Sequence, residues 1–335
     1  MKTISIIAPN IKEGGGKGLL LYLLNHLDEN YPNVFVRVYV DKSFKVINTN
    51  NREVITLSSW LKIILLFLKK CNNVIYFGNI PPMRKTSNSL LYFHSMYLLA
   101  EIKKLTSNMT LKRLFILKIL LQQFYIKHNI SNVVLVASQT KSVTKILKNR
   151  YNYYSVKELP FYKPLIIESG VTKEYDFCYI SNVYPHKNHT KLLDALEILS
   201  NENISLSIVL TIDKKNVDIL KRIEKINSKG FVSLYNIGHV NMDVVIKTYA
   251  KSKCLVYPSI IESFGLPLIE AVEAGIDVIA SDLPYVFEVI KPSLTFDPNN
   301  PKDIAQKMNM YLNHETPRSI KIVENKISEL IEILL

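Results

Sequence analysis

The chain has 335 residues, enough for two domains of about 150 residues each, and its 48% hydrophobic and 21% charged residues exclude an intrinsically disordered protein. Its longest unbroken apolar run, residues 63–68, is far shorter than the about 20 residues of a membrane-spanning helix, and no apolar stretch near the start is long enough for a signal peptide. The formal net charge of +13 is uneven, because residues 1–163 carry 24 Lys and Arg against 7 Asp and Glu, a net of +17, and the remainder carries −4.

Strand-like and helix-like segments alternate along the first half of the chain. Apolar runs predict strands at 4–8, 34–40, 74–77, 90–93 and 133–137, and amphipathic or longer apolar segments predict helices at 19–27, 58–70, 110–127 and 141–148. Such alternation favours a parallel sheet that is covered by helices on both faces. The sequence therefore predicts an α/β domain.

The second half repeats this pattern, with strands expected at 177–180, 205–210, 231–235, 254–257 and 277–280. A segment with a proline at each end, residues 159–164, coincides with the change in the sign of the charge and is the predicted connection. We expect an N-terminal domain at 1–162, a C-terminal domain at 163–318, and an amphipathic helix at 319–335 that packs back on the N-terminal domain. Cys71, Cys178 and Cys254 are widely spaced and are expected to be free thiols of a cytoplasmic protein.

Glycines cluster directly after the first predicted strand. Four of the ten glycines in the chain fall at positions 14, 15, 16 and 18. Glycines between a strand and its helix let backbone N–H groups approach an anion at the helix N-terminus, although a flexible surface turn would also explain them. The spacing matches neither G-x-G-x-x-G nor a P-loop.

The richest set of polar side chains follows the strand at 254–257. Residues 257–270 read YPSIIESFGLPLIE, and Pro267 suits the first position of a helix whose Gly265 and Leu266 amides could donate to a phosphate. Glu270, one turn into that helix, could accept hydrogen bonds from the vicinal hydroxyls of a ribose, and Glu262 from those of a sugar. The alternative is that Glu270 only stabilises the helix dipole and Glu262 faces solvent.

The spacing of Glu262 and Glu270 resembles the E-x7-E motif of the retaining group 1 glycosyltransferases, family four, which have the GT-B fold. Further segments resemble that family in the expected order along nearly the whole chain. They are residues 14–18, 93–95, 137–140, 182–189, 236–240, 280–284 and 288–289. The resemblance implies two Rossmann-like domains whose parallel sheets face each other across a cleft, and it is most specific in the C-terminal domain.

The resemblance also implies roles for individual residues. Lys187 and the amides of Gly265 and Leu266 would hold the diphosphate of a nucleotide-sugar donor, Glu270 its ribose and Glu262 its sugar. The other residues expected at the donor or the transferred sugar are His94, Phe264, Asn182, Gly15 and Gly16. Asn182 departs from the family, because many relatives place an arginine there as a second cation. His94, taken alone, follows an apolar strand, where a histidine is more often structural than catalytic.

No metal or other cofactor is expected. The chain has no D-x-D sequence of the kind that holds Mn²⁺ or Mg²⁺ on a diphosphate in transferases of another architecture. A lysine and a helix N-terminus can stabilise the leaving phosphate instead. His186 and His189 have the spacing of a metal pair but no evident third ligand.

The basic half predicts an anionic partner. Residues 59–70 and 111–118 mix apolar side chains with cations, as interfacial helices do, so we expect peripheral binding to the inner face of an anionic cytoplasmic membrane. The same apolar residues could instead pack in the core, with the lysines in solvent.

The predicted function is transfer of a sugar from a nucleotide-sugar donor to a saccharide acceptor, with retention of configuration. We expect the acceptor to be lipid-linked and to belong to surface polysaccharide synthesis (O-antigen or capsule), because such an acceptor would explain the basic half. One alternative is a nucleotide-sugar epimerase or hydrolase on the same fold. Another is a basic nucleic-acid-binding protein, against which the acidic, motif-bearing second half argues.

Overall fold

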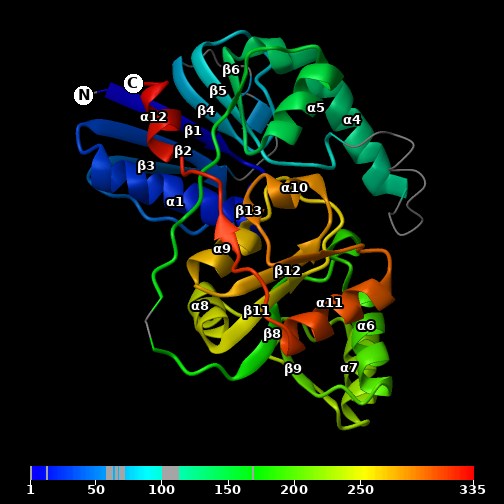
Figure 1. Cartoon of the computed structure of the whole chain (residues 1–335). Helices are drawn as coiled ribbons and strands as arrows, with labels where there is room; N and C mark the ends of the chain where they lie inside the picture. Colours follow the sequence, from blue (N-terminus) through cyan, green and yellow to red (C-terminus); the bar gives the residue numbers. More distant parts are fainter. Residues whose placement is uncertain are drawn as a thin grey trace. The chain divides into compact units, whose positions relative to one another are not determined.

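The structure is a computed structural model that describes residues 2–12, 14–57, 63–64, 67, 72–99, 113–167 and 170–335. The chain divides into an N-terminal unit, Met1–Lys163 with Glu324–Leu335, and a C-terminal unit, Pro164–Val323. Each unit contains one large sheet whose strands are all parallel, as the alternating pattern predicted (Figure 1). Among the described residues, no helix combines the length and the apolar character needed to cross a bilayer.

The sheet of the N-terminal unit has the strand order β3-β2-β1-β4-β5-β6-β7. Its strands are β1 (Lys2–Ala8), β2 (Val34–Asp41), β3 (Arg52–Leu57), β4 (Asn72–Phe77), β5 (Ser87–Phe93), β6 (Leu135–Ser138) and β7 (Val156–Glu158). Its helices are α1 (Gly14–Asn30), α4 (Arg113–Asn129), α5 (Lys141–Tyr151) and α12 (Ile327–Glu332), with a 3-10 turn at Ile130–Asn132. Buried side chains of α4 and α5, such as Ile119, Ile126 and Leu147, pack on Tyr76 and Phe93 of the sheet.

The five strands predicted for this unit are present, and β3 and β7 were missed. β3, with the sequence REVITL, mixes polar and apolar residues at one edge of the sheet, and β7 is a three-residue strand at the other edge, so neither forms the apolar run of a strand that is buried on both faces. The helices predicted at 110–127 and 141–148 correspond to α4 and α5. Most of the helix predicted at 58–70, together with Cys71, lies outside the described residues.

The sheet of the C-terminal unit has the order β10-β9-β8-β11-β12-β14. The strands are β8 (Tyr175–Tyr179), β9 (Leu206–Leu210), β10 (Val232–Asn236), β11 (Ser252–Tyr257), β12 (Asp277–Ser281) and β14 (Leu294–Phe296). The helices are α6 (His189–Asn201), α7 (Val217–Asn227), α8 (Met242–Lys251), α9 (Leu266–Glu273), α10 (Pro284–Phe287) and α11 (Pro301–Asn313), with a 3-10 turn at Pro185–Lys187. Figure 1 shows α8 and α9 on one side of this sheet and α6, α7 and α11 on the other. The predicted free thiols Cys178 and Cys254 are buried and unpaired.

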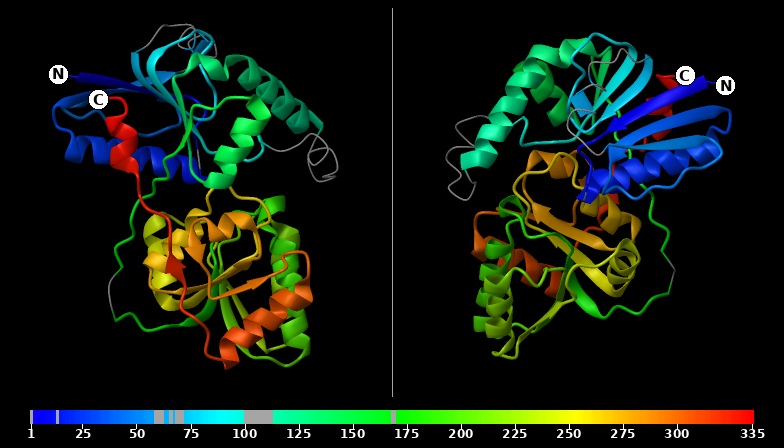
Figure 2. Two further views of the ribbon diagram at one scale, coloured as in Figure 1. Left: turned by 45° about the horizontal axis from the view of Figure 1, so that its top comes forward. Right: turned by 180° about the vertical axis from the view of Figure 1, so that it is seen from behind.

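The C-terminal segment is a correction to the helix predicted at 319–335. Ile320–Lys321 form a short strand, β15, antiparallel to β13 (Ile290–Lys291), and only Ile327–Glu332 are helical (Figure 2). The Ser319 hydroxyl oxygen accepts hydrogen bonds from the amides of Val278 and Ser293, at 2.8 and 3.0 Å, and so holds this part of the chain extended along the sheet.

The returning segment then packs on the N-terminal unit. The amide of Lys326 donates to the carbonyl of Pro160 at 2.7 Å, and the Asn325 side chain donates to the carbonyl of Tyr162 at 2.7 Å. Ile327, Leu330 and Ile331 of α12 are buried there.

Both sheets have a switch point, where successive connections leave in opposite directions. It lies between β1 and β4 in the N-terminal unit and between β8 and β11 in the C-terminal unit. In open parallel sheets, ligands bind beyond the carboxyl ends of the strands at such a point. The loops after these four strands contain most of the residues that the sequence singled out.

Candidate active site

In the C-terminal unit, two loops meet beyond the carboxyl ends of β8 and β11. The amide of Ile260 donates to the carbonyl of His186 at 2.8 Å, and the Ser259 hydroxyl, which also contacts Glu262, lies 3.1 Å from the same carbonyl. The Asn188 amide group donates to the carbonyls of Pro258 at 3.1 Å and Pro298 at 2.7 Å. These bonds fix the loop that carries Lys187 against the loop that carries Glu262.

Lys187 ends the 3-10 turn that leads into α6. The turn reverses at Asn188, whose φ of 60° lies in the left-handed region, where asparagine is tolerated better than most residues. The buried hydroxyl of Tyr179 donates to the carbonyl of Lys187 at 2.5 Å. The bonds of Tyr179 and Asn188 therefore fix the backbone at Lys187, and the ion pair with Glu262 orients its side chain.

Glu262 accepts three hydrogen bonds on a single oxygen. Oε1 lies 2.5 Å from Lys187 Nζ, 2.8 Å from the Tyr257 hydroxyl and 2.5 Å from the Ser259 hydroxyl, and Lys187 Nζ also donates to the Tyr257 hydroxyl at 3.2 Å. The Lys187 and Glu262 side chains are only 16% and 13% exposed, so the ion pair is poorly screened by water. Burial, followed by the charge of Glu262, raises the pKa of Tyr257 well above its usual value, which keeps its hydroxyl a donor.

The loop that carries Glu262 ends at the N-terminus of α9. Gly265 caps this helix with a φ of 82°, and a Cβ there would lie 3.0 Å from Leu268 Cδ1, so the position requires glycine. Leu266 is the first helical residue and Pro267 the second, one position later than predicted. Among the bonds of the described residues, the amides of Gly265 and Leu266 donate to no acceptor, as expected for the first amides of a helix.

Glu270 lies one turn further into α9, and the hydroxyl of the buried Tyr249 donates to its Oε2 at 3.2 Å. Burial raises the pKa of Glu270 to about 7, with a smaller rise from the charge of Glu273, while the Tyr249 hydroxyl opposes the shift. Desolvation outweighs the hydrogen bond because one neutral donor replaces little of the hydration of a carboxylate. Glu270 consequently titrates near neutral pH.

The remaining residues predicted for this half of the site lie in the same unit. Asn182 follows β8 and is exposed, whereas Phe264 as a whole residue is only 2% exposed and lies in the interior. His189 begins α6 and packs against Tyr179, with ring centroids 4.8 Å apart, and burial lowers its pKa to about 4. Within the described ranges, no three His, Cys, Asp or Glu side chains are grouped as metal ligands would be.

The N-terminal unit brings His94 and Gly16 together at its own switch point. The Asn79 side chain accepts a hydrogen bond from the His94 amide at 2.6 Å, and its Nδ2 lies 3.5 Å from His94 Nε2. A Cβ at Gly16 would lie 3.3 Å from His94 Nε2, so glycine permits this close approach. Burial lowers the pKa of His94 to about 4, so the imidazole is neutral at physiological pH.

The glycine cluster corrects the predicted start of the first helix. We placed the glycines in a loop before a helix at 19–27, but α1 already begins at Gly14, whose φ of 71° turns the chain into the helix. Gly15 and Gly16 are therefore first-turn residues, whose amides have no partner within the helix. Buried leucines one to three turns later hold the helix on the sheet, including Leu20, Leu23 and Leu27.

Four residues of these sites were not singled out as site residues from the sequence. Tyr257 and Ser259 sit within five residues of Glu262, and their hydroxyls could have been recognised as local donors. Tyr249 precedes Glu270 by 21 residues and Asn79 precedes His94 by 15, and no local pattern links them.

Comparisons with known proteins bear on this geometry. Residues 166–328 match the sequence model of the family described as glycosyl transferases group 1. Over 146 residues the chain is 29% identical to O-antigen chain mannosyltransferase B of Escherichia coli, a match that covers 42% of this chain and 38% of that protein. Matches to the other curated relatives span no more than half of their lengths.

Two solved structures resemble the whole chain. WaaG, a glycosyltransferase involved in lipopolysaccharide biosynthesis, has a TM-score of 0.66 at 13% identity, with 99% of both chains covered. HepE of Anabaena, in complex with UDP and glucose, has a TM-score of 0.60 at 13% identity, with 93% of this chain and 90% of that one covered. The GT-B fold of two parallel-sheet α/β domains is thereby confirmed, and the C-terminal unit is related in sequence to the group 1 glycosyl transferases.

Replacing Asn188 tests how strongly the turn before α6 is held. Asn188→Ala loses two hydrogen bonds, each contributing about 1 kcal/mol, and keeps a left-handed backbone that costs roughly another 1 kcal/mol. We expect the free energy of unfolding in urea to fall by about 2–3 kcal/mol. Asn203, with a φ of 59°, is exposed and is the matched control, so Asn203→Ala should lose only about 1 kcal/mol. Equal losses in the two variants would show that the side-chain bonds of Asn188 contribute nothing.

Proposed function

We propose that this chain is a glycosyltransferase that moves a sugar from a nucleotide-sugar donor to a saccharide acceptor in the synthesis of a surface polysaccharide. The observation that carries the proposal is the Lys187–Glu262 pair beside the N-terminus of α9, within the segment that matches the group 1 glycosyl transferases. The polysaccharide assignment is supported by relatives named as O-antigen chain mannosyltransferases.

The donor diphosphate would bind to Lys187 and to the amides of Gly265 and Leu266. The ammonium group of Lys187 has three protons to donate. Two of them go to Glu262 Oε1 and the Tyr257 hydroxyl, which leaves the third for a phosphate oxygen. The first amides of α9 add the positive end of the helix dipole. Together they would stabilise the negative charge that develops on the leaving nucleoside diphosphate.

Glu270 and Glu262 would bind the two sugars of the donor. Glu270 would accept from the vicinal hydroxyls of the ribose, with Tyr249 holding the carboxylate in place. Glu262 offers its second oxygen to the transferred sugar, because the hydrogen bonds that it accepts from described residues all reach Oε1. Asn182 and the backbone of Phe264 lie in the same loops.

In the N-terminal unit, His94 would contact the transferred sugar and the amides of Gly15 and Gly16 would contact the donor. A neutral imidazole can accept a hydrogen bond from a sugar hydroxyl, which suits the lowered pKa of His94.

Retention of the anomeric configuration, and membership of family four, rest on the E-x7-E spacing of Glu262 and Glu270. The chemistry would be that of a hexosyltransferase.

The acceptor would be lipid-linked and the protein would work in the cytoplasm, peripherally bound to the anionic inner face of the cytoplasmic membrane. The net charge of +17 over residues 1–163 supports this, because cations near an anionic surface contribute about 1 kcal/mol each. Of the two cationic segments at 59–70 and 111–118, residues 63–64, 67 and 113–118 are described.

Single substitutions in the donor site test the proposal. Lys187→Ala, Glu262→Gln and Glu270→Ala should each lower the rate of nucleoside diphosphate release in the presence of acceptor by about 10²–10³, because each removes a charged contact to the donor or transition state. Lys191→Ala, on the next turn of α6, is the matched control and should keep its rate. Full activity of both Lys187→Ala and Glu270→Ala would refute the assignment, and undiminished release without any acceptor would indicate a hydrolase.

Chelation tests the role given to Lys187 and the α9 amides. If these groups stabilise the leaving diphosphate, sugar transfer should proceed at the same rate in EDTA as in Mg²⁺ or Mn²⁺. The measurement is product formation after dialysis against EDTA, with and without added metal. Loss of transfer that is reversed by either ion would show that a metal holds the diphosphate.

The raised pKa of Glu270 predicts a pH-dependent donor affinity. A carboxylate accepts from two hydroxyls better than a carboxylic acid does, and with a pKa of about 7 the ionised fraction rises about tenfold between pH 6 and 8. The Kd of a nucleotide sugar, measured by calorimetry, should therefore fall by about tenfold over this range. Glu270→Gln should bind more weakly and show no such change, whereas an equally steep profile in that variant would place the titrating group elsewhere.

A further inference from the structure

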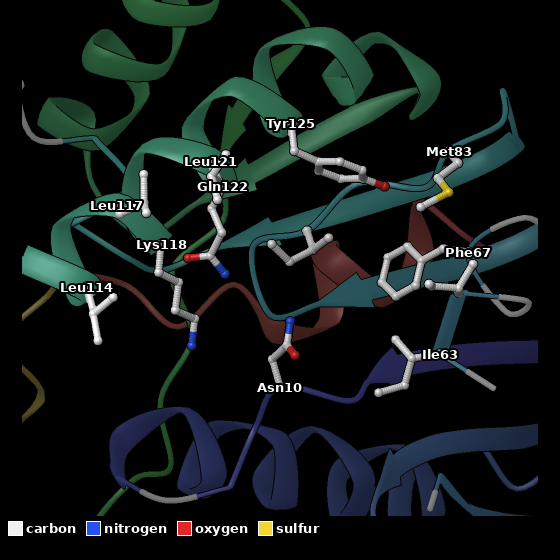
Figure 3. A pocket seen from close by; sticks show the side chains of 12 residues that line it. Asn10, Ile63, Phe67, Met83, Leu114, Leu117, Lys118, Leu121, Gln122 and Tyr125 are labelled. Carbon is white, nitrogen blue, oxygen red and sulfur yellow. The ribbon is translucent and has the colours of Figure 1, made fainter. Parts of the chain in front are cut away.

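An apolar pocket of about 500 Å³ lies in the N-terminal unit, within the range of about 300–1,000 Å³ that is typical of small-molecule sites. It joins the two cationic-apolar segments that the sequence singled out, because Ile63, Ile64 and Phe67 line it together with Leu114, Leu117 and Leu121 of α4 (Figure 3). The described parts of these segments therefore border one pocket.

Helix α4 is apolar on two opposite sides. Ile119 and Ile126 are buried against the sheet, as in any helix that covers a core. The pocket side, at a spacing of three and four residues, carries Leu114, Leu117 and Leu121, which are 82%, 53% and 62% exposed. A surface helix ordinarily turns a polar face to water, so this second apolar face indicates a ligand.

Three polar side chains interrupt the apolar lining. Figure 3 shows Lys118, Gln122 and Asn10 directed into the same part of the pocket. Within the part of the chain that the structure describes, none of the three forms a hydrogen bond or an ion pair with another side chain. A cation and two amides without partners among the described residues, beside apolar walls, suit one phosphate attached to a hydrocarbon chain.

The pocket adjoins the candidate site of the same unit. Asn10 and Ile11 follow β1, and a Cβ at Gly16 would lie 3.4 Å from Ile11 Cδ1 and 3.3 Å from His94 Nε2. Across the pocket, the Tyr125 hydroxyl of α4 donates to the carbonyl of Pro81 at 2.9 Å and fixes the helix to the loop after β4. A ligand with its phosphate near Asn10 and Lys118 would therefore begin close to His94.

We propose that this pocket binds the lipid phosphate of the acceptor, with Lys118, Gln122 and Asn10 around the phosphate and the first part of an isoprenoid or alkyl chain along Leu114, Leu117 and Leu121. The proposal rests on the proposed function and specifies how its acceptor is held. It differs from flat docking on a bilayer, because it assigns the affinity to residues that line one cavity and not to every apolar or cationic residue of α4.

Matched pairs on α4 distinguish the two modes. Leu121 lines the pocket and Phe124 does not, although they are 62% and 66% exposed. Lys118 lines the pocket and Lys127, also exposed on the same helix, does not. The probe is farnesyl phosphate below its micellar concentration, measured by calorimetry, with farnesol and inorganic phosphate as partial ligands and with vesicles of phosphatidylglycerol or phosphatidylcholine in parallel.

We expect Leu121→Gln and Lys118→Gln to weaken farnesyl phosphate binding at least about fivefold. The first substitution removes an apolar contact to the farnesyl chain, and the second removes the cation beside the phosphate. Phe124→Gln and Lys127→Gln should stay within about twofold of the unmodified protein, and farnesol and inorganic phosphate should both bind more weakly than farnesyl phosphate. Thermal unfolding of each variant checks that it is folded. We expect all four variants to fold, because the four side chains are exposed.

Equal losses within each pair, or saturable binding to phosphatidylglycerol vesicles but none to farnesyl phosphate, would overturn the pocket and favour flat docking on the membrane. The test requires no sugar transfer. If pocket-dependent binding of farnesyl phosphate is found while no nucleotide sugar binds to the protein, the proposed function fails and the pocket stands. If nucleotide sugars bind and farnesyl phosphate does not, the pocket fails alone.

Discussion

The pairing of β8 with β11 is the constraint on which the candidate donor site depends. The two strands are separated in the sequence by β9 and β10, yet they lie side by side, and this brings the loops after their carboxyl ends together. Lys187 and Glu262 are 75 residues apart and meet at 2.5 Å only through this pairing. The backbone and side-chain bonds to His186 O and Pro258 O then prevent the loops from separating.

Burial gives the two glutamates different chemistry. Glu262 is surrounded by a cation and two hydroxyls, so its charge is matched in place, whereas Glu270 has one neutral donor and a pKa near 7. Removing one member of a buried ion pair leaves an uncompensated charge, so the Lys187–Glu262 pair is a fixed part of the site even without a ligand. A diphosphate entering beside Lys187 would meet a cation that is already oriented, which reduces the reorganisation needed at the moment of reaction.

The N-terminal unit uses the same sheet geometry for a different kind of surface. Its switch point brings glycine amides and a neutral histidine together. Next to them lies α4, which exposes leucines on one side and packs its other side into the core. Leucines exposed along one cavity add little to the buried core, and the ligand that we propose would account for them. Basic charge alone, spread over the whole unit, would not require a cavity.

By itself the sequence determined the alternating elements and the two parallel sheets, because buried strands leave apolar runs, and it singled out Glu262, Gly265 and Glu270 beside a glycine-proline helix start. Lys187 was singled out only by its place in a segment that resembles the group 1 glycosyltransferases. The sequence did not reveal β3, β7 or the extended course of Ser319–Lys321, where edge pairing and a side-chain bond to the sheet override local propensity. Only the tertiary structure decided that Tyr249 reaches Glu270, that Asn79 reaches His94, and that Phe67 and Leu117 line one pocket. Each of these contacts joins residues that strand order brings together, and strand order is set by the packing of the whole sheet.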